Sequence, residues 1–87
     1  MNIIEIKNIT RKELPIYYRR LYTGLVVLEL MNKNIESEIE FQIEHKPTGQ
    51  TEINLNLTKT IDYPLVPLHK ELKNFIGALD STGKLPS

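Results

Sequence analysis

Five glutamates in the middle of the chain have a spacing that could serve acidic chemistry. They are Glu36, Glu38, Glu40, Glu44 and Glu52. On an extended strand, side chains two positions apart lie on one side, about 7 Å from each other, which suits two catalytic carboxylates or a hard cation. A catalytic pair also needs a partly dry pocket that separates the two pKa values, and a wet strand face does not provide one. We interpret the glutamates as a solvated face that discourages edge aggregation, with docking of a basic partner as the alternative.

Other reactive side chains are scattered along the chain. His45 and His69 have no HExxH-like spacing and no cysteine partner, because the chain has no cysteine. No serine lies in a glycine-flanked nucleophile elbow. Thr82-Gly83-Lys84 resembles the end of a phosphate loop, but the upstream glycine is missing, so we interpret it as the end of a helix. We expect no catalytic residues, no metal and no cofactor, and we predict that the protein is not an enzyme.

One segment, residues 11–22, mixes aromatic and basic side chains. Aromatic rings stack on bases while arginines neutralise phosphates, so a contact with single-stranded nucleic acid or with a partner protein is one interpretation. A core-facing aromatic stripe with solvated arginines is the other. The formal net charge of zero argues against nucleic acid, because phosphate binding normally shows as a positive balance. The candidate contact residues are Arg11, Lys12, Tyr18, Arg19, Arg20 and Tyr22.

Length and charge set further limits. A chain of 87 residues is expected to form a single domain, 1–87, with a small core. Basic residues outnumber acidic ones in residues 1–34, and acidic residues outnumber basic ones in residues 35–62. Such a charge dipole favours association with a complementary surface, including that of another copy. The chain shows neither a cationic leader with an apolar stretch nor a run long enough to span a bilayer, so we expect a cytoplasmic protein without membrane contact.

Two segments alternate apolar and polar residues with a period of two. In residues 35–45 and 51–61 the apolar side chains occupy odd positions, which predicts two antiparallel strands with one apolar face. Lys46-Pro47-Thr48-Gly49 has proline second and glycine fourth, as a type I turn followed by a bulge requires. That turn sets Phe41 opposite Leu55 and keeps every glutamate on the polar face.

Two more strands are predicted before these. Residues 25–31 form one strand, joined to the next by a two-residue turn at Asn32-Lys33, and residues 2–7 form a short first strand. The Asn32-Lys33 turn sets Gly24 opposite Phe41.

Residues 11–23 fit either a helix or a strand. Thr10 and Glu13 resemble a capping box, and Leu14, Tyr17, Tyr18 and Leu21 fall on one helical face. Pro15 argues for a strand instead. If residues 15–31 are all strand, the order of elements is similar to that of small single-strand-binding domains that dimerise through a final helix.

Residues 67–80 have the apolar spacing of an amphipathic helix. We expect its stripe to pack on the odd-numbered face of the sheet, which gives an α+β fold: an antiparallel β-meander covered by a C-terminal helix. The stripe consists of Leu68, Leu72, Phe75, Ile76 and Leu79.

Three apolar residues, Leu25, Val27 and Met31, point away from that face under this arrangement. They form the predicted dimer face. We predict a non-enzymatic interaction module that associates with itself as a homodimer, or with another protein. The alternative is a single-stranded nucleic-acid-binding domain that uses the segment 11–22.

Overall fold

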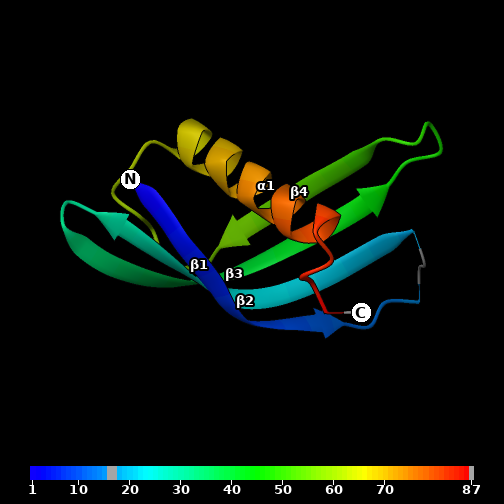
Figure 1. Ribbon diagram of the computed structural model, residues 1–87, viewed down its shortest axis with the longest axis horizontal. Helices are drawn as coiled ribbons and strands as arrows, with labels where there is room; N and C mark the ends of the chain where they lie inside the picture. Colours follow the sequence, from blue (N-terminus) through cyan, green and yellow to red (C-terminus); the bar gives the residue numbers. More distant parts are fainter. Residues whose placement is uncertain (16–17, 87) are drawn as a thin grey trace.

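The protein folds into a four-stranded antiparallel sheet with one helix against it (Figure 1). The computed structural model describes residues 1–15 and 18–86, so the predicted position of Tyr17 lies outside the described residues. The strands lie in chain order, each paired with the next, which confirms the predicted meander. The elements are β1 (Asn2–Lys12), β2 (Arg19–Leu30), β3 (Lys33–His45), β4 (Thr51–Leu57) and α1 (Leu65–Ser81).

The segment that the sequence left open between helix and strand is extended. Residues 11–12 end β1 and residues 19–23 begin β2, so a helix over 11–23 is wrong. Tyr22 pairs with Arg11 on one side and with Phe41 on the other, and its ring stacks on that of Phe41 with 5.1 Å between the centroids. Ladders on both sides of β2 satisfy its backbone groups along its whole length, which outweighs one capping box and four apolar positions.

The predicted pairing of β3 with β4 is confirmed. Phe41 lies opposite Leu55. In the turn, Lys46 donates its N–H to the Gln50 oxygen at 2.8 Å, and Gly49 adopts the left-handed φ of 87° that the bulge position requires. β4 ends at Leu57 instead of residue 61, because the chain leaves the sheet to reach the start of α1.

The turn between β2 and β3 differs from the prediction by two residues. Met31 and Asn32 form it, with φ of 52° and 61°, whereas the sequence predicted Asn32-Lys33. A shift of two keeps every side chain on its face but changes the partners, so Gly24 lies opposite Ile39 and not opposite Phe41. A left-handed methionine costs about 1–2 kcal/mol. The shift is compensated by the Tyr22–Phe41 contact, which only this register produces.

β1 is longer than the predicted 2–7 and is irregular. Its pairing with β2 shifts at Ile4 and again between Lys7 and Thr10, where Asn8 has a φ of 56°. These bulges bend the strand. Gly24 permits its close approach, since a Cβ there would lie 3.1 Å from a methyl of Ile6.

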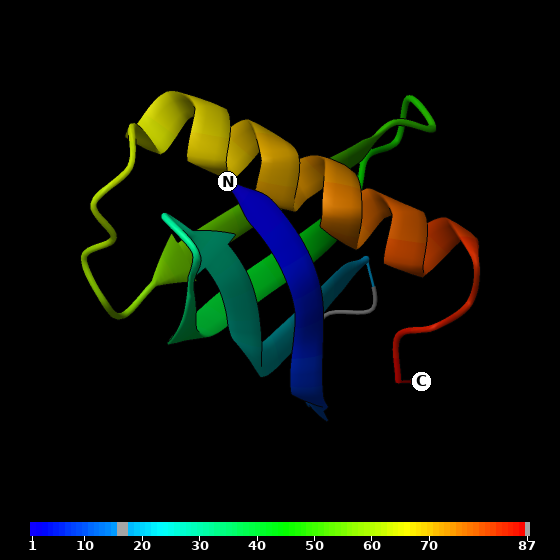
Figure 2. The ribbon, with the colours of Figure 1, turned by 60° about the vertical axis from the view of Figure 1, so that its left-hand side comes forward.

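The core lies between α1 and one face of the sheet, as Figure 2 shows. α1 packs mainly on β4 and also touches β1. Phe75 and Leu79 are half-buried at its border, and the predicted packing of the helix on the odd-numbered residues of β3 and β4 is confirmed. The fully buried side chains are Tyr22, Val26, Leu28, Ser37, Ile39, Phe41, Ile43, Leu68, Leu72 and Ile76.

The helix begins two residues earlier than predicted and ends at a glycine. Leu65 is its first residue, preceded by Pro64. At the other end, Gly83 adopts a φ of 69°, and the N–H of Lys84 reaches the Leu79 oxygen at 2.9 Å. These are the features of a Schellman motif, so Thr82-Gly83-Lys84 closes a helix and is not a phosphate loop.

Candidate interaction surfaces

The Arg/Tyr segment is divided between the two faces of the sheet. Residues directly opposite each other in a ladder point to the same side. Arg20 lies opposite Ile43, and therefore faces α1, whereas Arg19 lies opposite Glu44 on the other face. Arg11 shares the α1 side and Lys12 the opposite side, because their partners in β2 do. The structure therefore does not gather these side chains on one stacking platform.

Tyr22 and Arg20 serve the core. Tyr22 is fully buried and stacks on Phe41. Arg20 is 20 % exposed and forms an ion pair with Asp80 at 2.9 Å, and it donates to the Tyr22 hydroxyl at 3.1 Å. Its second terminal nitrogen also lies 3.1 Å from Nε2 of His45. Burial alone lowers the pKa of Arg20, but the hydrogen bond to Asp80 and the contact with Tyr22 outweigh it, so the pKa is raised.

Arg20 thereby links the sheet to the last turn of α1. Asp80 lies in that turn, where the partial charges of the free carbonyls are negative, and the guanidinium offsets both this charge and the carboxylate. The other members of the segment are more exposed. Arg19 lies 5.9 Å from the centre of the Tyr18 ring and pairs with Glu44 at 3.3 Å.

The side of the sheet opposite α1, which we name the polar sheet face, carries the five glutamates. Three of the five form ion pairs: Lys7 with Glu36 at 2.8 Å, Arg19 with Glu44, and Lys46 with Glu52. The hydrogen bond from Lys46 lowers the pKa of Glu52. These pairs connect neighbouring strands, as expected for a solvated charged face.

A hollow of about 500 Å³ opens on the polar sheet face beside the β1 bulge. Glu38 and Glu40 line it together with Lys12, and neither glutamate makes an ion pair with a described residue. Within residues 1–15 and 18–86 no three His, Cys, Asp or Glu side chains are grouped to hold a metal ion. The hollow thus has charge but no metal-binding geometry.

The predicted dimer face is partly covered by the chain's own side chains. Val27 is only 7 % exposed, since the Lys7–Glu36 ion pair crosses β2 beside it. Leu25 is half-buried. Met31 is 83 % exposed at the β2–β3 turn. The three residues do not form one continuous exposed apolar patch.

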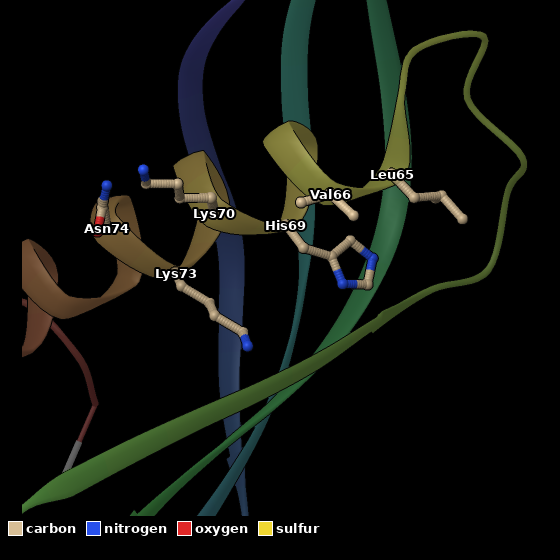
Figure 3. A pocket seen from close by; sticks show the side chains of 6 residues that line it. All are labelled: Leu65, Val66, His69, Lys70, Lys73 and Asn74. Carbon is tan, nitrogen blue, oxygen red and sulfur yellow. The ribbon is translucent and has the colours of Figure 1, made fainter.

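A different apolar surface lies where α1 begins. Leu65 is 65 % exposed and Val66 is 81 % exposed. They line a groove of about 470 Å³ with His69, Lys70, Lys73 and Asn74. Figure 3 shows His69 and Lys73 projecting from α1 on the side where β4 passes.

A smaller groove of about 260 Å³ continues this surface toward the sheet. Leu57 at the end of β4 lines it together with Leu65 and His69. We call the two grooves and the free edge of β4 the α1–β4 side. Sequence reasoning missed this surface because it placed Leu65 and Val66 in an extended connection. The available signal was an apolar dipeptide between Pro64 and Pro67.

The comparisons with known proteins give one match. A protein-family model matches residues 1–81, so the chain belongs to that family, whose name is a locus label and states no activity. The matched region contains all four strands and α1. No curated protein and no solved structure matches the chain. In the described part of the chain, no helix has the length and apolar character needed to cross a membrane.

Proposed function

We propose that this chain is a non-enzymatic interaction module that acts as a homodimer, with the two copies meeting on the α1–β4 side. One observation carries the proposal: Leu65 and Val66 stand 65 % and 81 % exposed beside the groove. Exposed apolar side chains that border a groove are typical of a docking surface. Covering both side chains contributes about 2–4 kcal/mol before entropy costs.

The size of the protein supports a second copy as the occupant. A chain of 87 residues buries a modest share of its surface, about two thirds, when it folds alone. Covering further apolar area by association therefore adds substantially to its stability. The balanced net charge of zero imposes no overall repulsion between two copies.

Single-stranded nucleic acid is the alternative ligand. The order of four strands followed by a helix favours it, since this order resembles that of the single-strand-binding domains described above. Two features weigh against it. The polar sheet face carries the glutamates, which repel phosphates, and Tyr22 is buried where a stacking platform needs exposed rings. We therefore place the homodimer first.

Sedimentation velocity at tens of micromolar tests the homodimer. We expect the wild-type chain to sediment as a dimer, and Val66→Glu to shift it to the monomer, because the change puts a charge into the interface. Met31→Glu is the matched control: Met31 is as exposed as Val66 but lies at the β2–β3 turn, so this variant should remain dimeric. Both side chains lie outside the core, so circular dichroism should show that both variants fold.

A wild-type chain that sediments as a monomer at 100 µM would refute the proposal. A dimer that Met31→Glu dissociates and Val66→Glu does not would place the interface on the face predicted from Leu25, Val27 and Met31. A salt-sensitive shift of the wild-type chain on a single-stranded oligonucleotide would favour the alternative.

A further inference from the structure

β4 is a sheet edge with a regular row of unpaired backbone groups. Lys46 donates to Gln50, and Thr58 donates to the Glu38 oxygen at 3.1 Å, so the hydrogen-bonded pairs between β3 and β4 involve even-numbered residues. In an antiparallel ladder the residues between them point their N–H and C=O groups the other way. These groups have no backbone partner among the described residues. They belong to Thr51, Ile53, Leu55 and Leu57.

The opposite edge of the sheet is built differently. β1 carries an irregularity at Ile4 and a second one at Asn8, which has a left-handed φ of 56°. Bulges of this kind twist an edge away and prevent the addition of a further strand. β4 pairs with β3 without any register shift over residues 51–57. Of the two edges, only that of β4 is ready to accept another strand.

We propose that the seam of the dimer is β4 paired antiparallel with β4 of the second copy, around a two-fold axis at Asn54. This proposal rests on the proposed function, since it specifies how the two copies meet. The register sets Asn54 opposite Asn54 and Ile53 opposite Leu55 of the second copy. The odd-numbered residues then exchange hydrogen bonds across the seam, as their outward groups require.

The side chains of β4 fit this register. All seven residues of β4 find an opposite residue, whereas an axis at Ile53 or Leu55 leaves two residues without one. Glu52 lies opposite Asn56 of the second copy, so no like charges meet. Ile53 and Leu55, which face α1 in each copy, come together on one side. A strand from an unrelated protein gains no advantage from this symmetry at Asn54, and for that reason we infer a second copy as the occupant.

The amount of surface also involves α1. A stable interface buries about 1,200–2,000 Å² in total, which is more than two seven-residue strands supply. α1 packs on β4, so a two-fold axis through the seam brings both α1 helices to the same side of the joined sheets. The exposed Leu65 and Val66, with the groove that reaches Leu57, provide the additional apolar area.

Single-cysteine cross-linking tests the axis. The chain has no cysteine, so Asn54→Cys introduces one thiol per copy. At a non-hydrogen-bonded position on the axis the two Cα atoms lie about 4.5 Å apart, within the range for a disulfide. Asn56→Cys is the matched control, because two Asn56 residues lie four positions apart along the seam, about 13 Å. Under mild oxidation, non-reducing gels should show mostly covalent dimer for Asn54→Cys and little for Asn56→Cys.

A second variant gives a readout without oxidation. Asn54→Asp places two like charges directly opposite each other, and we expect it to raise the dimer Kd about 3- to 10-fold, measured by sedimentation equilibrium. Equal cross-linking of both cysteine variants, or none with Asn54→Cys, would overturn the seam. If the wild type is nevertheless a dimer, the proposed function stands and only the seam fails. A monomeric wild type removes both.

Discussion

Replacing Arg20 by methionine tests whether this side chain holds α1 to the sheet. Arg20 lies 2.9 Å from Asp80 and 3.1 Å from the Tyr22 hydroxyl, and its side chain is 20 % exposed. Methionine keeps most of the aliphatic stem and removes the guanidinium. The structure thus predicts a loss of folding stability, whereas a role in nucleic-acid binding predicts almost none.

The expected loss follows from the bonds that Arg20 makes. A hydrogen bond to a charged group contributes about 1.5–3 kcal/mol, and a neutral one about 1 kcal/mol. Part of this is offset because methionine no longer carries the cost of burying a charge. We therefore expect the free energy of unfolding to fall by about 2 kcal/mol. At a urea m value of about 1 kcal/mol per molar, the midpoint falls by about 2 M.

Urea titration followed by circular dichroism measures this change, and a double-mutant cycle isolates the ion pair. Arg20→Met, Asp80→Asn and the double variant should give a coupling energy of about 1 kcal/mol or more. Arg19→Met is the matched control. Arg19 is the adjacent arginine, but its side chain is 37 % exposed on the polar sheet face, so its loss should cost less than about 1 kcal/mol.

Two results would refute the reasoning: a stability of Arg20→Met within about 0.5 kcal/mol of the wild type, or a coupling energy near zero. The same structural role affects the test of nucleic-acid binding. A variant that lacks both Arg19 and Arg20 loses stability through Arg20, so a loss of binding would not show contact with phosphate. Arg19→Met alone, which leaves the core intact, is the appropriate variant.

Two further predictions concern the core and the polar sheet face. Leu72→Ala should lower the free energy of unfolding by about 2–5 kcal/mol, since Leu72 is fully buried under α1; a loss below about 1 kcal/mol in thermal or urea unfolding would contradict this packing. Lys46→Met should raise the pKa of Glu52 back toward its ordinary value, because Lys46 lowers that pKa in the folded chain. The ion pair therefore stabilises the fold above the ordinary glutamate pKa and is lost as the pH falls through the lowered value; an unchanged Glu52 titration by NMR would contradict this.

The candidate surfaces show where sequence reasoning stopped. The polar sheet face was predicted as a set of residues, since a strand period of two assigns each glutamate to a side. The role of Arg20 was not, because Asp80 is sixty positions away in the chain and no local pattern connects them. The covering of Val27 likewise depends on an ion pair between β1 and β3.

The sequence by itself determined the meander of β3 and β4, their register and the apolar stripe of α1. These depend on local periodicity and on one turn whose proline and glycine permit a single geometry. Tertiary structure decided the rest. The segment 19–23 became a strand, and the β2–β3 turn moved by two residues, because Tyr22 stacks on Phe41. Likewise, Leu65 and Val66 emerged as a surface only when α1 was placed on β4. Contacts between residues far apart in the chain decide such features, and local propensity does not encode them.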